Sequence, residues 1–199
     1  CSQSTLSRVE QGSRELDSLT SEMLLGRIGR EVTRFELILN AEDYYLNQLR
    51  IEINENIEEK NYIKAKEKIN LYRQHMPAEG KVHEQFCCYM ECRILIAQNE
   101  ITEKLSALLL RAIRYTIPDY LLENCVSRRL YSPVEIELIR MHITYNDRKC
   151  ECNEVELFLI MDFVTEFYSL KQQEKIEIPL LVDCVKYEIA LEKYNRALA

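Results

Sequence analysis

The chain has 199 residues, of which 47% are hydrophobic and 30% charged, and its formal net charge is −7 at pH 7. These values fit one ordinary domain, or a small domain followed by a larger one, and they argue against a generally basic nucleic-acid-binding surface. No apolar run approaches the ~20 residues of a membrane span. We therefore expect a cytoplasmic protein with no membrane partner.

The first predicted element is a helix over residues 2–11. Ser2 can cap it, because a serine oxygen accepts from a free N–H of the first turn. Leu6 and Val9 fall on one face of a 3.6-residue period, and Gly12 follows as a left-handed C-cap. The opposite face carries serine, arginine and glutamine, whose side chains can bind base edges in DNA. An ordinary amphipathic helix with a polar outer face is the alternative.

The stretch Ser2-Gln3-Ser4-Thr5-Leu6-Ser7-Arg8-Val9-Glu10-Gln11-Gly12 resembles the recognition helix and following turn of lambda-repressor-like (XRE family) helix-turn-helix domains. The resemblance implies double-stranded DNA as a partner and implies DNA contacts by Gln3, Ser4, Thr5, Ser7 and Arg8. The first two helices of that family would precede Cys1, so we expect an N-terminally truncated domain that binds DNA poorly by itself.

The rest of the chain predicts helix after helix, with no alternating strand, and therefore an all-α fold. Glycine is nearly absent after the first segment, and Gly26 and Gly29 are expected to form a hinge between a DNA-reading head (1–31) and a helical body (32–199). The prolines are expected at joints between helices. The further helices are predicted near 18–27, 32–40, 42–58, 62–75, 82–98, 101–116, 132–147, 153–170 and 177–197.

These helices form pairs of about 34–45 residues, which favours an α-solenoid over an irregular bundle. Lys60-Asn61-Tyr62-Ile63-Lys64-Ala65 resembles the turn and second-helix start of a tetratricopeptide repeat, and the other joints are degenerate. We expect three pairs and an unfinished fourth. The first helices of the pairs, 42–58, 82–98, 132–147 and 177–197, would line a concave binding surface.

The order of a helix-turn-helix followed by tetratricopeptide-like repeats resembles a class of Gram-positive transcription regulators. The resemblance implies a sequence-specific DNA-binding regulator that forms a homodimer and whose helical domain senses a small peptide or another effector. Two alternatives remain: a tetratricopeptide-like interaction scaffold that does not bind DNA, and a peptide-regulated response-regulator phosphatase.

Neither an enzyme nor a metal site is predicted. His75, His83 and His142 are scattered, and no nucleophile turn or glycine-rich phosphate loop occurs. Cys87-Cys88-x-x-x-Cys92 and Cys150-x-Cys152 lack paired CxxC spacing. Reduced thiols that behave as small hydrophobes are favoured over a disulfide, and no cofactor is expected.

Overall fold

The computed structural model describes Ser7, Gln11 and residues 15–30, 40–120, 130–145 and 151–190. Within these ranges the chain forms eight α-helices and no strand, so the all-α prediction is confirmed. The helices are α2 (Ser18–Arg27), α3 (Ala41–Glu58), α4 (Tyr62–His75), α5 (Lys81–Ala97), α6 (Glu103–Thr116), α7 (Pro133–Tyr145), α8 (Glu151–Phe167) and α9 (Leu170–Ala190).

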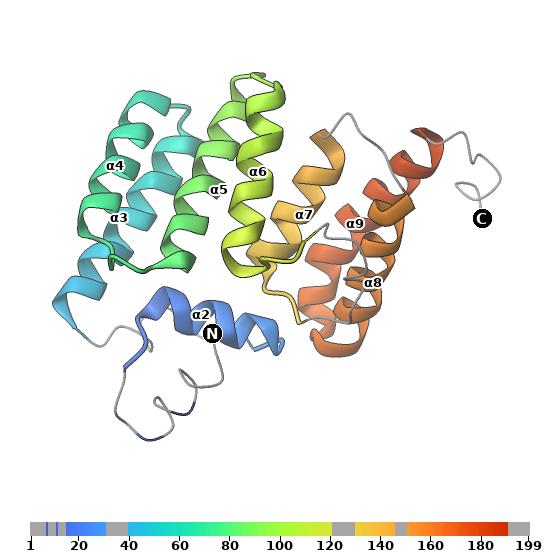
Figure 1. The fold of residues 1–199 in the computed structure, drawn as a ribbon, viewed down its shortest axis with the longest axis horizontal. Coiled ribbons are helices and arrows are strands. Elements are labelled where there is room, and N and C mark those ends of the chain that lie inside the picture. The colour runs from blue at the N-terminus through green and yellow to red at the C-terminus, as the bar shows by residue number, and fades with distance from the viewer. Residues whose placement is uncertain are drawn as a thin grey trace.

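Consecutive helices pack against one another from α3 to α9, and α3 also contacts α5 as α7 contacts α9. Figure 1 shows α3 to α7 side by side, with α2 running across their lower ends. This layout is compatible with a helical solenoid. The helix α2 packs directly on α5 and α7, so residues predicted for the head contact the helical body.

Three helices, α2, α3 and α5, end in the same motif. Each is followed by a residue in the left-handed region, Gly29 (φ 68°), Lys60 (φ 61°) or Asn99 (φ 58°). The next N–H donates to the carbonyl five residues earlier, from Arg30 to Leu25, from Asn61 to Asn56 and from Glu100 to Leu95. This hydrogen bond satisfies a carbonyl that the helix end would otherwise leave free. The turns after Lys60 and Asn99 thus reverse the chain and bring α4 and α6 back along their predecessors.

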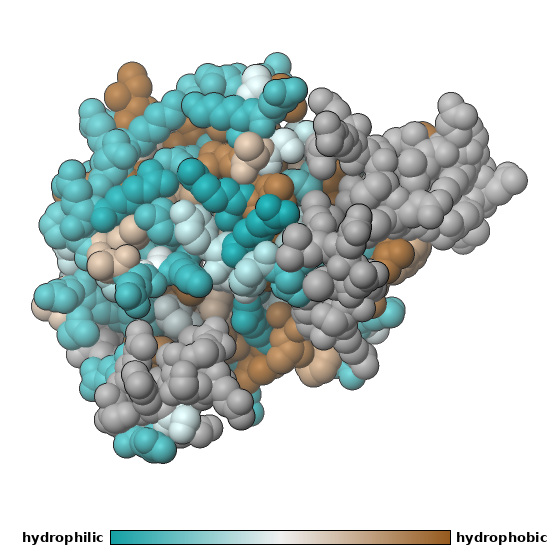
Figure 2. Space-filling view, viewed as in Figure 1, coloured by the Kyte–Doolittle hydropathy of each residue, from teal (hydrophilic) through white to brown (hydrophobic). Residues whose placement is uncertain are grey.

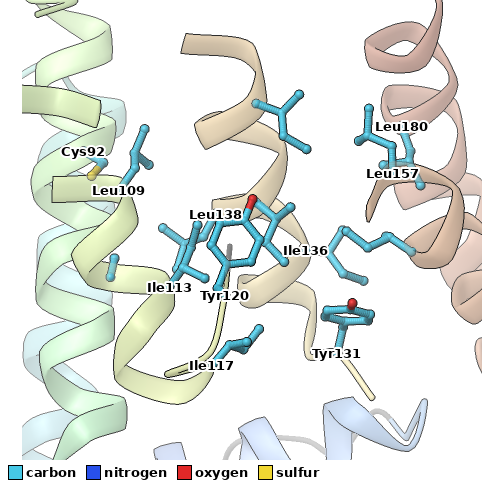
Figure 3. Close-up of a cluster of buried hydrophobic side chains, with 14 of the residues drawn as sticks. Cys92, Leu109, Ile113, Ile117, Tyr120, Tyr131, Ile136, Leu138, Leu157 and Leu180 are labelled. Carbon is cyan, nitrogen blue, oxygen red and sulfur yellow. The ribbon is translucent and has the colours of Figure 1, made fainter. Parts of the chain in front are cut away.

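The buried apolar side chains form two clusters that share α5. One cluster joins α3, α4 and α5 and includes Ile53, Tyr72 and Cys87. The other joins α5 through α9 and includes Cys92 and Leu109 (Figure 3). Different faces of α5 are therefore buried, and its buried side chains include the polar His83 and Gln85.

Gly26, within α2, and Gly29, which follows the C-cap Ile28, allow close packing. A Cβ on Gly26 would lie 2.9 Å from Cδ of Pro133, and one on Gly29 would lie 2.0 Å from the carbonyl oxygen of Phe167. The sequence predicts a hinge at these positions. In the structure both glycines instead permit α2 to approach α7 and the end of α8.

The observed helix boundaries differ most at the last joint. The sequence predicts a break before 177, but α9 begins at Leu170, after Ser169, whose carbonyl accepts from the N–H of Gln173 at 2.9 Å. Pro179 therefore lies inside a helix, where it removes one hydrogen bond, and the prediction that it marks a joint is wrong. The helix predicted over 32–40 lies outside the described residues, except Asn40. No helix in the described ranges combines the length and apolar character that crossing a membrane requires.

Candidate functional site

Most of the predicted DNA contacts lie outside the described residues: Gln3, Ser4, Thr5 and Arg8. Ser7 is described, and it is helical and exposed. Its Oγ accepts a hydrogen bond from Nε2 of Gln11 at 3.3 Å, and its carbonyl accepts from the Gln11 N–H at 3.0 Å. The spacing of four residues between Ser7 and Gln11 is that of an α-helical hydrogen bond, and the rest of the helix predicted over 2–11 lies outside the described residues.

The candidate site is a groove of about 520 Å³ between α2 and the helical body, and most of its lining is apolar. Its walls come from α2, α3, α5, the start of α7 and α9, with Tyr168 at one side. The helices α3, α5, α7 and α9 correspond to the four that the sequence assigns to a concave surface. The helix α2 adds a wall that the sequence does not predict.

The helix α5 supplies the floor of the groove. Val82, Phe86, Met90 and Arg93 recur at intervals of three or four residues, so they share one face of the helix. Tyr89 and Gln85 lie beside this row. Over the three turns from Val82 to Arg93, the floor extends about 16 Å.

A buried polar network fixes the N-terminal half of α2. The Asp43 carboxylate on α3 accepts from the backbone N–H of Ser18 at 3.1 and 3.2 Å and from its Oγ at 2.7 Å. Arg50 donates to Ser18 at 3.2 Å, to Asn47 at 3.0 Å and to Glu22 at 3.0 Å. The side chains of α3 therefore meet the free N–H groups at the start of α2 and pair its glutamate.

Asp17, the N-cap of α2, also contacts α5. Its Oδ1 accepts from the backbone N–H of Thr20 at 2.8 Å and lies 3.1 Å from Nε2 of buried His83, in a bent contact. The other ring nitrogen of His83 lies 2.6 Å from the hydroxyl of Tyr72. Burial raises the pKa of Asp17, but the contacts with His83 and Thr20 outweigh it and hold this pKa below its usual range. Burial raises the pKa of Tyr72, so its hydroxyl stays protonated and can donate a hydrogen bond to Nδ1 of His83.

An ion pair between α2 and α7 fixes the other end of α2. Arg27 donates from Nε to the Glu135 carboxylate at 3.0 Å and makes a second, shorter contact from Nη2. The Glu135 side chain is fully buried and also accepts from the Ser132 N–H at 2.8 Å. Burial alone would raise the pKa of Glu135, but the Arg27 guanidinium lowers it below its ordinary value. The Tyr168 hydroxyl lies 3.1 Å from the carbonyl oxygen of Gly26, which adds a third contact.

Charged side chains in the groove are mainly cationic: Arg30, Arg50 and Arg93 line it together with one carboxylate, Glu22. Arg50 is 97% buried and is matched by Glu22. Arg93 is half-buried and donates to Oδ1 of Asn54 at 2.6 Å, with its guanidinium 5.8 Å from the ring centre of Tyr89. In the described part of the chain, no carboxylate pairs with Arg93.

Three cysteine side chains of α5 lie in the hydrophobic core. Cys87, Cys88 and Cys92 are free and buried, and burial raises the pKa of Cys87 to about 12. These thiols remain protonated at neutral pH and pack as small apolar groups. Among the described residues, no group of three or more metal-ligating side chains converges on one point.

No protein-family model, curated protein or solved structure matches this chain.

Several groove residues could not be selected from the sequence. Arg93 occurs in a helix with several other charged residues. The pairing of Asp43 with Ser18, which positions α2 beside the groove, joins positions 25 residues apart. The sequence signal for the groove was the spacing of Val82, Phe86 and Met90. This spacing places them on one helix face, but it does not show whether another helix packs over that face. Only the placement of α2 across this row defines the groove.

Proposed function

We propose that the chain belongs to a sequence-specific DNA-binding regulator whose helical body binds an effector in the groove between α2 and the helical body. The position of α2 carries this proposal. In sequence, α2 follows the segment that resembles a recognition helix, and in space it forms one wall of the groove. An effector in the groove would therefore contact the element that leads to the DNA-reading segment.

The contacts of α2 support such coupling. Its two ends are held mainly by polar contacts, through Asp43 at the start and Glu135 at the end. Its middle faces the groove with Leu19 and Met23. A ligand that packs against these two side chains would favour one position of α2 over another. The difference in the ligand's affinity for the two positions of α2 would set the size of the change in DNA binding.

The proposal includes a homodimer, because helix-turn-helix proteins commonly read two half-sites one helical turn apart. Light scattering over a range of concentrations tests it. A strict monomer at the highest concentration would contradict the dimer.

The decisive experiment measures DNA affinity by fluorescence anisotropy. It uses the product of the complete open reading frame and labelled DNA from the region upstream of its gene. Arg8→Ala should weaken binding by about 1–3 kcal/mol and relax the preference at one base position. Arg114→Ala, at an exposed site on α6, is the matched control and should leave affinity unchanged. Equal affinity and base preference in the Arg8 variant would refute the DNA-reading role.

The second candidate is an interaction scaffold without a DNA role. Exposed apolar side chains on α9 favour it, because a row of this size on one helix is typical of a protein contact. The residues are Ile178, Leu181, Val182, Val185 and Ile189, which are 42–62% exposed. If the complete protein binds no DNA at low salt, the scaffold is the better description.

A further inference from the structure

Arg93 is a half-buried cation that faces an apolar groove. Its contacts are with the Asn54 amide oxygen, the sulfur of Met90 at 3.7 Å and the ring of Tyr89. Within the described ranges it has no carboxylate partner, and a partly desolvated guanidinium is stabilised by one. The site thus offers charge complementarity to an anionic group.

Arg50, in the same groove, is already neutralised. Glu22, Asn47 and Ser18 accept its hydrogen bonds, at 3.0, 3.0 and 3.2 Å. A ligand anion would gain little by approaching it. Arg93 is therefore the better anchor, and exposed Arg30 on the opposite wall adds to the positive potential.

The remainder of the floor suits an aliphatic chain. Met90, Phe86 and Val82 continue from Arg93 toward α2, and Met23 of α2 also lines the groove. The distance of about 16 Å from Arg93 to Val82 accommodates an extended alkyl chain. Each buried CH₂ contributes about 0.8 kcal/mol to binding by leaving water. The face over α3 to α6 in Figure 2 is mostly hydrophilic, which contrasts with this lining.

The polar groups of the groove do not suit a peptide backbone. A bound peptide needs partners for its N–H and C=O groups, and the walls are helices whose own backbone groups are already bonded. The NH₂ groups of the two side-chain amides are engaged as well, and so is the Asn54 oxygen. Asn54 donates to the Arg50 carbonyl at 2.8 Å and accepts from Arg93, and Gln85 donates to Thr116 at 2.7 Å and to the Ala112 carbonyl at 3.2 Å.

We propose that the groove binds an aliphatic carboxylic acid, with its carboxylate on Arg93 and its alkyl chain along α5 toward α2. The proposal rests on the groove invoked under Proposed function but not on DNA binding. It names the chemistry of the effector: one anionic group at the end of an apolar chain without amide groups.

Isothermal titration calorimetry on this chain, with dodecanoate and dodecanol as probes, tests the proposal. Dodecanoate should bind with a stoichiometry of one, and dodecanol, with the same chain and no charge, should bind at least ten-fold more weakly. Equal affinity for the two probes, or no binding of dodecanoate, would overturn the proposal. An apolar tetrapeptide is the third probe, and tighter binding of this peptide than of dodecanoate would also overturn it.

Two variants locate the ligand. Arg93→Gln should weaken dodecanoate binding at least ten-fold and remove the difference between acid and alcohol, whereas Arg114→Gln should change neither. Val134→Glu places a carboxylate at an exposed position of the wall and should also abolish binding while preserving the fold by circular dichroism. Wild-type affinity in both variants would show that the acid binds elsewhere and refute the assignment.

The DNA-binding experiment and the dodecanoate titration test different claims. If dodecanoate binds in the groove and the complete protein binds no DNA, this inference stands and the proposed regulator function fails. If DNA is bound and dodecanoate is not, the regulator function stands and the assigned ligand is wrong.

Discussion

The ion pair between Arg27 and Glu135 predicts a large and specific loss of stability in Glu135→Gln. Two N–H groups of Arg27 and the backbone N–H of Ser132 converge on the Glu135 carboxylate, which is fully buried. Glutamine has the same shape but only one acceptor oxygen. Its NH₂ group would face a donor, and the Arg27 charge would lose its partner.

The expected loss follows from the burial of both partners. Removing one member of a buried pair costs about 3–5 kcal/mol. The Arg27 side chain is 19% exposed and so keeps some hydration, and the glutamine oxygen keeps one hydrogen bond. We therefore expect the free energy of unfolding to fall by about 2–3 kcal/mol.

Urea unfolding, followed by far-UV circular dichroism at neutral pH, measures this loss. The matched control on the same helix is Glu137→Gln, which removes a partly exposed partner of Arg140 and should cost at most about 0.5 kcal/mol. The variant Arg27→Met and the double variant complete a thermodynamic cycle, in which the double variant should lose less than the sum of the single losses. Additive losses, or equal losses in Glu135→Gln and its control, would refute the reasoning.

Three further predictions concern stability. Asp17 has a folded pKa below its ordinary value of 3.8, so its stabilising contribution is complete above about pH 4 and is lost as pH falls toward the folded pKa; urea midpoints should fall over this range, and less steeply in Asp17→Asn. Gly29→Ala should lower the free energy of unfolding by more than about 2 kcal/mol, because φ at Gly29 is positive and the new Cβ would overlap a carbonyl oxygen. Lys60→Gly should raise the free energy of unfolding by up to about 1 kcal/mol, because φ at Lys60 is also positive. Urea unfolding that changes the stability of both variants in the same direction would contradict this account. Ile53→Ala, at a fully buried site, should cost about 2–5 kcal/mol in the same assay, and Ile63→Ala, at a 76% exposed site, should stay within about 0.5 kcal/mol of wild type; similar losses would show that exposure does not decide the cost.

The sequence predicted the all-α class and most helix positions because apolar spacing and turn residues are local signals. The turn at Lys60-Asn61 illustrates this: the sequence predicts helices over 42–58 and 62–75 on either side of it, and in the structure α3 ends at Glu58 and α4 begins at Tyr62. Pro179 was misleading, since a proline can lie inside a helix that packing maintains.

The groove depended on long-range placement, which a single sequence does not encode locally. The contacts that place α2 join Arg27 to Glu135 and Gly26 to Tyr168, across 108 and 142 positions. Each of these residues looks ordinary in its own helix. The network became visible only when the folded chain brought the partners together.

The sharing of α5 by two apolar clusters has a consequence for how the protein unfolds. Residues such as Cys87 and Cys92 belong to different clusters but to one helix, so neither cluster can lose its packing without exposing part of α5. The two halves should therefore unfold together, and the amides of α5 should exchange with solvent deuterium among the slowest in the described chain. A cut through this helix would leave neither half with a complete interior.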